Sequence, residues 1–127
     1  MHKGSGLCGG VAFTITGDLS EPSACHCSQC RKQSGHVWSS THMPETALTL
    51  TAQDSLDWYA ASDSAKRGFC RTCGSFLFWK HQDEDMISVS MGSLDPPTGL
   101  HLARHIFVAD KGDYYDITDD LPQFERS

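Results

Sequence analysis

The sequence predicts an all-β fold, a compact domain of short antiparallel strands with minimal helix. Apolar and polar residues alternate in runs of six or seven residues, which is the pattern of half-buried strands. Turn-prone segments separate these runs, as they do in sheets of short strands. No segment carries a helical pattern longer than about one turn, too short for a helix that is stable without tertiary support. The 127 residues correspond to a single domain, residues 1–127, that buries roughly two-thirds of its unfolded surface.

The first predicted strand covers residues 11–16, Val-Ala-Phe-Thr-Ile-Thr, and is closed by the turn-forming dipeptide Gly17-Asp18. Similar runs predict six further strands, at residues 36–42, 47–52, 56–61, 75–81, 86–91 and 102–108. Turn-prone segments lie at residues 53–55, 82–85 and 95–99. We therefore expect about seven strands.

Helix is predicted only in two short segments. Residues 28–33 and 44–46 each suit about one helical turn. Gly35 is expected to end the first of them in a left-handed conformation. Near the C-terminus, residues 119–124 form an extended tail that Leu121 and Phe124 are expected to pin to the body of the domain.

Composition excludes several classes of function. With 39% hydrophobic and 20% charged residues, the chain is typical of globular proteins, and no apolar run approaches the roughly 18 residues of a membrane span. The formal net charge is −6 and no basic stripe is present, so we expect no nucleic-acid partner. No apolar signal core follows Met1, so we expect a cytoplasmic protein. Its six cysteines are then metal ligands or reactive thiols and not a disulfide framework.

The most informative feature is the run of residues 25–30, which places Cys25, Cys27 and Cys30 within six residues. Thiols at this density converge on one soft metal ion, although a redox disulfide or buried thiols are alternatives. Zinc held by four cysteines is usually structural, whereas three protein ligands leave a position for water or substrate. This run is therefore the first candidate for a catalytic metal site.

A second cysteine cluster is the C-x2-C-G motif of Cys70, Cys73 and Gly74. Two residues between cysteines let both sulfurs face one metal, and the glycine accommodates a positive φ. The one remaining cysteine is Cys8. We therefore predict two three-cysteine sites, Cys25/Cys27/Cys30 and Cys8/Cys70/Cys73, with up to two Zn²⁺ ions per chain.

Motifs along nearly the whole chain resemble one known family. They are Gly6-x-Cys8-Gly9-Gly10-Val11, Cys25-His26-Cys27-x-x-Cys30-Arg31-Lys32-x-Ser34-Gly35, Phe69-Cys70-x-x-Cys73-Gly74-Ser75-x-Leu77, Gly92-Ser93-Leu94-Asp95, His105-Ile106-x-Val108 and Tyr115-Asp116-Ile117-x-Asp119-Asp120-Leu121-Pro122. This combination resembles the glutathione-dependent formaldehyde-activating (GFA) family, whose domain is similar to part of the vertebrate centromere protein V.

The resemblance implies a β-rich zinc-binding domain with two zinc sites. The catalytic zinc would lie at Cys25, Cys27 and Cys30, and a structural zinc would be held by an N-terminal C-x-C pair together with Cys70 and Cys73. The type activity of the family joins glutathione and formaldehyde into S-(hydroxymethyl)glutathione and is classed as carbon–sulfur lyase. The implied partners are therefore a small-molecule thiol and an aldehyde.

One position departs from the family pattern. Where a cysteine is expected two residues before Cys8, this chain has Gly6. The fourth position of the structural site is then filled by His2, by another histidine, by water or by nothing. Because metal binding contributes to folding, we expect zinc at this site to be weaker or differently completed than in relatives.

The chemistry of the first site follows from its ligands. Three thiolates and Zn²⁺ carry a net charge of −1, so the zinc activates water less well than a three-histidine site but still anchors an incoming thiolate. Glutathione carries two carboxylates, for which Arg31, Lys32 and Arg67 are the predicted contacts, with solvated or structural roles as the alternative for each.

Two histidines lie in or near the predicted site, His26 and His105. His26 lies between two ligands, so its ring is expected to point away from the metal they bind, either exposed or supporting the ligands from behind, with ligation as the alternative. His105 is either a base or orienting group in the cleft, or a hydrogen-bonded structural histidine.

Three functional classes remain. The first is a lyase of the S-(hydroxymethyl)glutathione synthase type, the second a non-catalytic zinc- or glutathione-binding module, and the third an interaction protein. The acidic charge makes chromatin binding the weakest of these.

Overall fold

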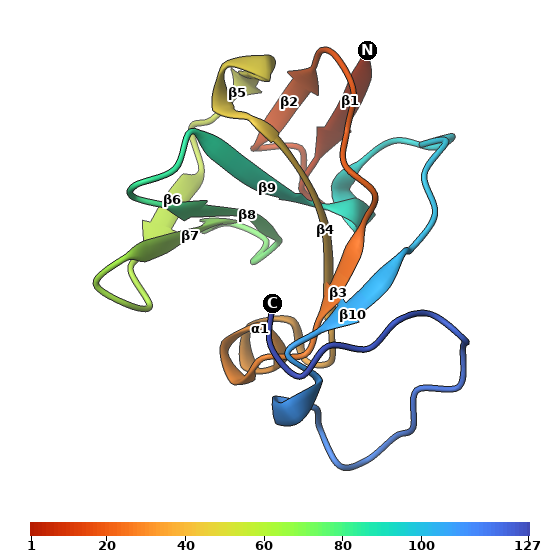
Figure 1. Ribbon diagram of the computed structural model, residues 1–127. Coiled ribbons are helices and arrows are strands. Elements are labelled where there is room, and N and C mark those ends of the chain that lie inside the picture. Colours follow the sequence, from red (N-terminus) through yellow and green to blue (C-terminus); the bar gives the residue numbers. More distant parts are fainter.

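The computed structural model describes all residues, 1–127, and contains two β-sheets (Figure 1). The smaller sheet has the order β1-β2-β5, with β1 His2–Ser5, β2 Ala12–Ile15 and β5 Leu48–Ala52. The larger sheet has the order β10-β3-β4-β9-β8-β7-β6. Its strands are β3 Ser23–Cys25, β4 Trp38–Pro44, β6 Leu56–Tyr59, β7 Ala65–Cys70, β8 Phe76–His81, β9 Met86–Ser90 and β10 Arg104–Ile106.

The core lies between the two sheets. In β2 the side chains alternate, so that Phe13 and Ile15 are fully buried while their neighbours are half-buried. Phe13 meets Phe78 of β8 edge-on, with ring centroids 5.4 Å apart. Leu77 and Val89 complete this part of the core. Burial of such side chains contributes about 1.5–3 kcal/mol each, so the core holds the smaller sheet against the larger one.

All seven predicted strands form, six of them shorter than expected and β4 displaced by two residues, and the mostly-β prediction is confirmed. Three further strands, β1, β3 and β7, were not predicted. β1 reads His-Lys-Gly-Ser and has no apolar residue, whereas β3 has only three residues. All pairs are antiparallel except β10 with β3, which is parallel. The parallel pair is possible because almost eighty residues of the chain separate the two strands.

The predicted helical turn becomes helix α1, Ser28–Ser34, and Gly35 ends it with φ 88° as expected. The second predicted turn is the 3₁₀ helix Glu45–Ala47, and two more 3₁₀ turns cover Met91–Ser93 and Val108–Asp110. None of these helices has the length and apolarity that a bilayer span requires.

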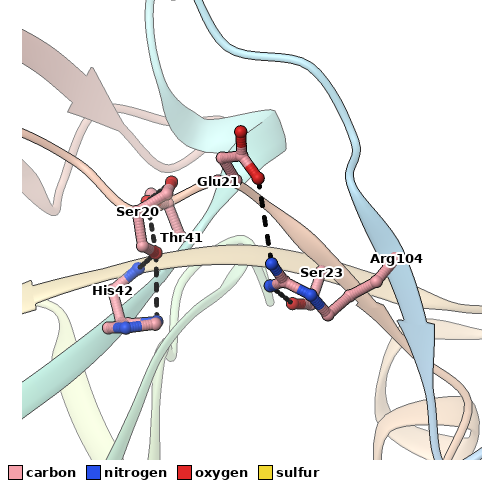
Figure 2. A network of polar contacts seen from close by, with 6 residues as sticks. All are labelled: Ser20, Glu21, Ser23, Thr41, His42 and Arg104. Carbon is pink, nitrogen blue, oxygen red and sulfur yellow. Dashed lines mark hydrogen bonds and ion pairs between the residues drawn. The ribbon is translucent and has the colours of Figure 1, made fainter. Parts of the chain in front are cut away.

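Strand β3 leads directly into the first cysteine cluster and is held by a polar network (Figure 2). The Ser20 hydroxyl lies 3.2 Å from the Thr41 hydroxyl and 3.0 Å from Nδ1 of His42 on β4. Arg104 of β10 donates to the Ser23 hydroxyl at 3.0 Å and lies 3.8 Å from the Glu21 carboxylate. The network therefore fastens the start of β3 to both neighbouring strands.

The C-terminal tail, residues 111–127, makes a wide loop, returns along the edge of β10 and ends beside α1 (Figure 1). The amide of His105 donates to the Pro122 carbonyl, and the amide of Phe124 donates to the His105 carbonyl, both at 2.9 Å. Leu121 is half-buried, but Phe124 is 45% exposed, so the expectation that the Phe124 side chain pins the tail was wrong. Backbone hydrogen bonds hold the tail instead, because β10 offers an unpaired strand edge.

Candidate functional site

The first cysteine cluster is assembled where β3 passes into α1. Cys25 is the last residue of β3, Cys27 is the N-cap of α1, and Cys30 lies in its first turn. Successive side chains of extended backbone point to opposite sides, so Cys25 and Cys27 share a side, and the helical turn brings Cys30 to them. The three sulfurs lie within 4.8 Å of one another, and Cys27 Sγ accepts a hydrogen bond from the Cys30 amide at 3.3 Å.

These sulfurs fit a zinc ion. With Zn–S bonds of about 2.3 Å, a tetrahedral site needs its sulfurs about 3.8 Å apart, which the cluster allows. Hydrogen bonds from the Cys25 and Cys30 thiols, together with the nearby Arg67 charge, lower the pKa of Cys27 to about 2. The pKa of Cys25 is raised, first because its thiol is the donor to Cys27 and then because it is buried. A thiolate is thus favoured within the cluster before any metal binds.

A cavity of about 550 Å³ opens beside the cluster, within the roughly 300–1,000 Å³ typical of small-molecule sites. Trp38 lines it and is only 7% exposed, stacked on Phe76 with ring centroids 4.1 Å apart. Its indole Nε1 is buried without a hydrogen-bond partner. The remaining lining includes Cys25, Cys27, Cys30, Ser40, Arg67, Trp79, Glu84, Ile106, Phe107, Asp110 and Ser127.

Arg67 is the one cation in the wall of this cavity. It is 4% exposed, and its guanidinium donates to Cys30 Sγ at 3.5 Å, to the Gln33 amide oxygen at 3.3 Å and to the Gln29 amide oxygen at 3.1 Å. It forms no ion pair with a carboxylate. Because a buried charge is costly unless it is compensated, the thiolates of the cluster are its nearest counter-charge.

The other two predicted ligand contacts lie on α1 outside this cavity. Lys32 is exposed and lines a neighbouring surface hollow, which it shares with Arg67. Arg31 is half-buried, and its Nε has no hydrogen-bond partner. Of the three, the structure therefore brings only Arg67 to the cysteine cluster, and ligand contact by each remains a prediction.

The second cluster, Cys8, Cys70 and Cys73, also forms, with its sulfurs within 4.8 Å of one another. Cys8 is exposed and its sulfur lies 3.6 Å from that of the buried Cys70. Hydrogen bonding to the Ser75 hydroxyl, 3.2 Å away, is the main reason that the pKa of Cys73 is lowered to about 6. Gly74 has φ 81°, as expected.

No histidine nitrogen or carboxylate oxygen joins this second cluster. His2 lies in β1 opposite Ile15. A Cβ added at Gly6 would lie 3.3 Å from the Ser75 hydroxyl, so position 6 does face the neighbourhood of Cys73. The missing ligand is therefore not replaced by a histidine of this chain.

His26, on the side of the first cluster away from the cavity, belongs to a group of hydrogen-bonded side chains that the sequence predicted only in part. His26 points away from the sulfurs, as predicted, and is only 2% exposed. Its Nε2 lies 2.9 Å from Nδ1 of His105, whose Nε2 lies 2.9 Å from the Asp119 carboxylate. The Tyr115 hydroxyl contacts Nδ1 of His26. His105 is thus buried and hydrogen-bonded at both ring nitrogens and does not line the cavity, whereas the contacts of Tyr115 and Asp119 could not be read from their tail sequence.

The pKa values agree with this arrangement. Burial lowers the pKa of His26, and the hydrogen bond from His105 lowers the pKa of Asp119. Burial raises the pKa of Tyr115. The tyrosine is therefore protonated, His26 neutral and the aspartate ionised near neutral pH.

Two known proteins are similar to this chain over nearly its whole length. A curated protein of Schizosaccharomyces pombe, named as an uncharacterized lyase, is 24% identical over 130 residues, covering 97% of this chain and 90% of that protein. A crystal structure of a Rhodobacter sphaeroides protein is 20% identical, covers 95% of this chain and 98% of that chain, and superimposes with a TM-score of 0.62. This second likeness supports the fold alone.

The family comparison is more specific. The sequence model described as "Glutathione-dependent formaldehyde-activating enzyme" matches residues 1–110, a segment that contains all six cysteines of the two clusters. The chain therefore belongs to the glutathione-dependent formaldehyde-activating enzyme family.

Proposed function

We propose that the protein is a zinc-dependent carbon–sulfur lyase that reversibly joins glutathione, or a related thiol, to formaldehyde or another small aldehyde. The observation that carries this proposal is the opening of the Cys25/Cys27/Cys30 cluster into a cavity of about 550 Å³. Membership of the family and the name of the yeast relative support lyase chemistry.

Cys25, Cys27 and Cys30 would hold the zinc ion. When bound there, zinc supplies a soft Lewis-acid position at which a thiol is held as thiolate near neutral pH. Arg67 offsets the negative charge of the sulfurs through its contact with Cys30. Trp38, which is stacked on Phe76, gives the cavity an apolar wall, which strengthens electrostatic interactions inside it.

The proposed reaction balances without an oxidant. The sulfur of the thiol forms a bond to the aldehyde carbon, the carbonyl π-bond breaks onto oxygen, and the proton released by the thiol ends on that oxygen. The reverse reaction breaks the carbon–sulfur bond. The cavity walls would orient the two reactants relative to each other.

Charged groups around the cavity suit a zwitterionic tripeptide. Glutathione carries two carboxylates and one ammonium group. Arg67 and Lys32, which share the neighbouring hollow, are assigned to the carboxylates, with Arg31, which directly follows Cys30 on α1, as a further candidate. Asp110 or Glu84 in the cavity wall would accept from the ammonium group. All six cysteines are free, which suits a reducing compartment, and we assign the activity to the cytoplasm.

The test is NMR exchange spectroscopy of free and glutathione-bound formaldehyde, with zinc-loaded protein and with the Cys27→Ser variant. We expect the zinc-loaded protein to accelerate exchange over buffer and Cys27→Ser to abolish the acceleration. Cys73→Ser is the matched control, because it removes one sulfur from the other cluster. Binding of glutathione without any acceleration would contradict the enzyme assignment and leave a zinc- and thiol-binding module.

A further inference from the structure

A hydrogen-bonded chain of four side chains, with two buried histidines at its centre, lies behind the first cysteine cluster, whereas Asp119 at its far end is 43% exposed. It runs from Tyr115 through His26 and His105 to Asp119, with Nε2 of His26 2.9 Å from Nδ1 of His105 and Nε2 of His105 2.9 Å from the carboxylate. His26 is 2% and His105 6% exposed. His26 is itself the residue between Cys25 and Cys27, so one end of this chain is built into the cluster.

All four ring nitrogens of the two histidines have a hydrogen-bond partner. An ionised carboxylate only accepts, so the His105 Nε2–H donates to Asp119. Nδ1 of His105 pairs with Nε2 of His26, and Nδ1 of His26 pairs with the Tyr115 hydroxyl. No polar ring atom is left unsatisfied in this buried position.

This arrangement fixes the ring of His26 at both nitrogens. A second anchor is the His26 amide, which donates to the Ile106 carbonyl at 3.0 Å. Because neighbouring side chains of an extended segment point to opposite sides, holding the ring of His26 on one side holds Cys25 and Cys27 on the other. Partners of this kind, one layer behind the ligands, commonly orient a metal site.

Two of the four residues come from outside the segment that the family comparison matches. That match ends at residue 110, whereas Tyr115 and Asp119 lie in the C-terminal tail, the last segment in the colour series of Figure 1. Main-chain bonds between β10 and the tail at Pro122 and Phe124 hold the tail independently of these two side chains. Removal of the Tyr115 hydroxyl or the Asp119 carboxylate should therefore leave the tail in place.

We propose that Tyr115, His26, His105 and Asp119 are positioning residues that set the metal affinity of the Cys25/Cys27/Cys30 cluster. Tyr115 and Asp119 close the hydrogen-bond chain at its two ends, so loss of either leaves a ring nitrogen of a buried histidine without its partner. The inference rests on the proposed function to the extent that it places zinc at this cluster. The second cluster has no connection to the four residues and serves as an internal control.

The experiment follows zinc loss from each cluster separately. Zinc-loaded full-length protein is exposed to excess EDTA and iodoacetamide, and mass spectrometry measures the alkylation of each cysteine over time. We expect Tyr115→Phe and Asp119→Ala to expose Cys25, Cys27 and Cys30 roughly tenfold faster than in the unaltered protein. Alkylation of Cys8, Cys70 and Cys73 should not change.

Neighbouring residues provide matched controls. Tyr114→Phe removes a hydroxyl that contacts only the exposed His36, and Asp120→Ala removes an exposed carboxylate beside Asp119; both should behave like the unaltered protein. Asp119→Asn keeps an oxygen that can accept from His105 and should retain most of the protection.

Three results would overturn the proposal. One is unchanged protection of the first cluster in Tyr115→Phe and Asp119→Ala, and another is equal loss of protection at both clusters, which would indicate general destabilisation. In either case the zinc assignment stands. Absence of zinc-dependent protection of Cys25, Cys27 and Cys30 in the unaltered protein would overturn the zinc assignment as well.

Discussion

The cluster of Cys25, Cys27 and Cys30 and the cluster of Cys8, Cys70 and Cys73 present the same three sulfur ligands at similar separations. Their surroundings differ. The first opens into a cavity, has the buried cation Arg67 beside it and a hydrogen-bonded histidine behind it. The second has the exposed Cys8 and two serine hydroxyls, those of Ser55 and Ser75, next to its sulfurs.

An incomplete ligand set does not by itself indicate a catalytic metal. Three sulfurs leave an open position in both clusters, but only the first pairs that position with a cavity, a compensating charge and fixed ligands. The second joins the turn before β2 to the β7–β8 turn, where a metal would tie the smaller sheet to the larger. We therefore expect the first cluster to act on substrate and the second to stabilise the fold.

The largest expected effect is that of replacing a cysteine ligand, which should lower stability at the second cluster and abolish activity at the first. Cys73→Ser should lower the free energy of unfolding of the zinc-saturated protein by about 2–3 kcal/mol, as expected when a metal at about 100 times its Kd is lost. Formaldehyde exchange per folded molecule should persist. Urea unfolding with and without EDTA measures the first effect. If Cys73→Ser also abolishes exchange, the division of roles between the clusters is wrong.

A smaller effect is expected for the cation beside the first cluster. Arg67→Met removes the charge next to the thiolates and should weaken zinc binding there roughly tenfold, about 1.4 kcal/mol. Lys66→Met is the matched control, because this neighbouring cation is exposed and packs over Trp58, 4.4 Å from the ring centroid. Competition with a zinc-binding dye measures both. Equal affinities in the two variants would argue against charge compensation by Arg67.

Substitution of the glycine that ends each cysteine turn should affect zinc binding at one cluster and not at the other. Gly35 and Gly74 have φ 88° and 81°, so alanine at either costs about 1 kcal/mol. Gly35→Ala is expected to loosen zinc at the first cluster only, and Gly74→Ala at the second only. Thermal unfolding and per-cysteine alkylation report on each, with Gly92→Ala, at a glycine without positive φ, as the control. Loss at the opposite cluster would show that the two sites are not independent.

The smallest effect concerns pH. The hydrogen bond from His105 lowers the pKa of Asp119, so this carboxylate stabilises the fold above its unfolded pKa of about 3.9, and the contribution is lost as pH falls through the lower folded value. In metal-free protein, the stability advantage over Asp119→Asn should therefore shrink below about pH 4. Denaturant unfolding between acidic and neutral pH measures it. A pH-independent difference would contradict ionisation of Asp119 in the chain.

Sequence patterns were sufficient for the parts of the molecule with local signals. Alternation indicated seven of the ten strands, and cysteine spacing indicated both clusters. β7, with the sequence Ala-Lys-Arg-Gly-Phe-Cys, was missed because one of its buried positions is occupied by the charged residue Arg67 and not by an apolar residue. The contacts of Tyr115 and Asp119 join residues far apart in the sequence, and no local pattern marks such pairs. The sequence correctly predicted that the ring of His26 points away from the cysteine sulfurs, but its hydrogen-bond partners could be found only in the three-dimensional structure.

The central claim is that thiol capture takes place at the first cluster. The most direct measurement is a crystal structure of the zinc-loaded protein with glutathione, with diffraction data collected on both sides of the zinc absorption edge. We predict an anomalous peak among Cys25, Cys27 and Cys30, with the glutathione sulfur completing the coordination and the tripeptide in the adjoining cavity. A zinc-free first cluster, a fourth ligand from the protein, or glutathione bound only elsewhere would contradict the account.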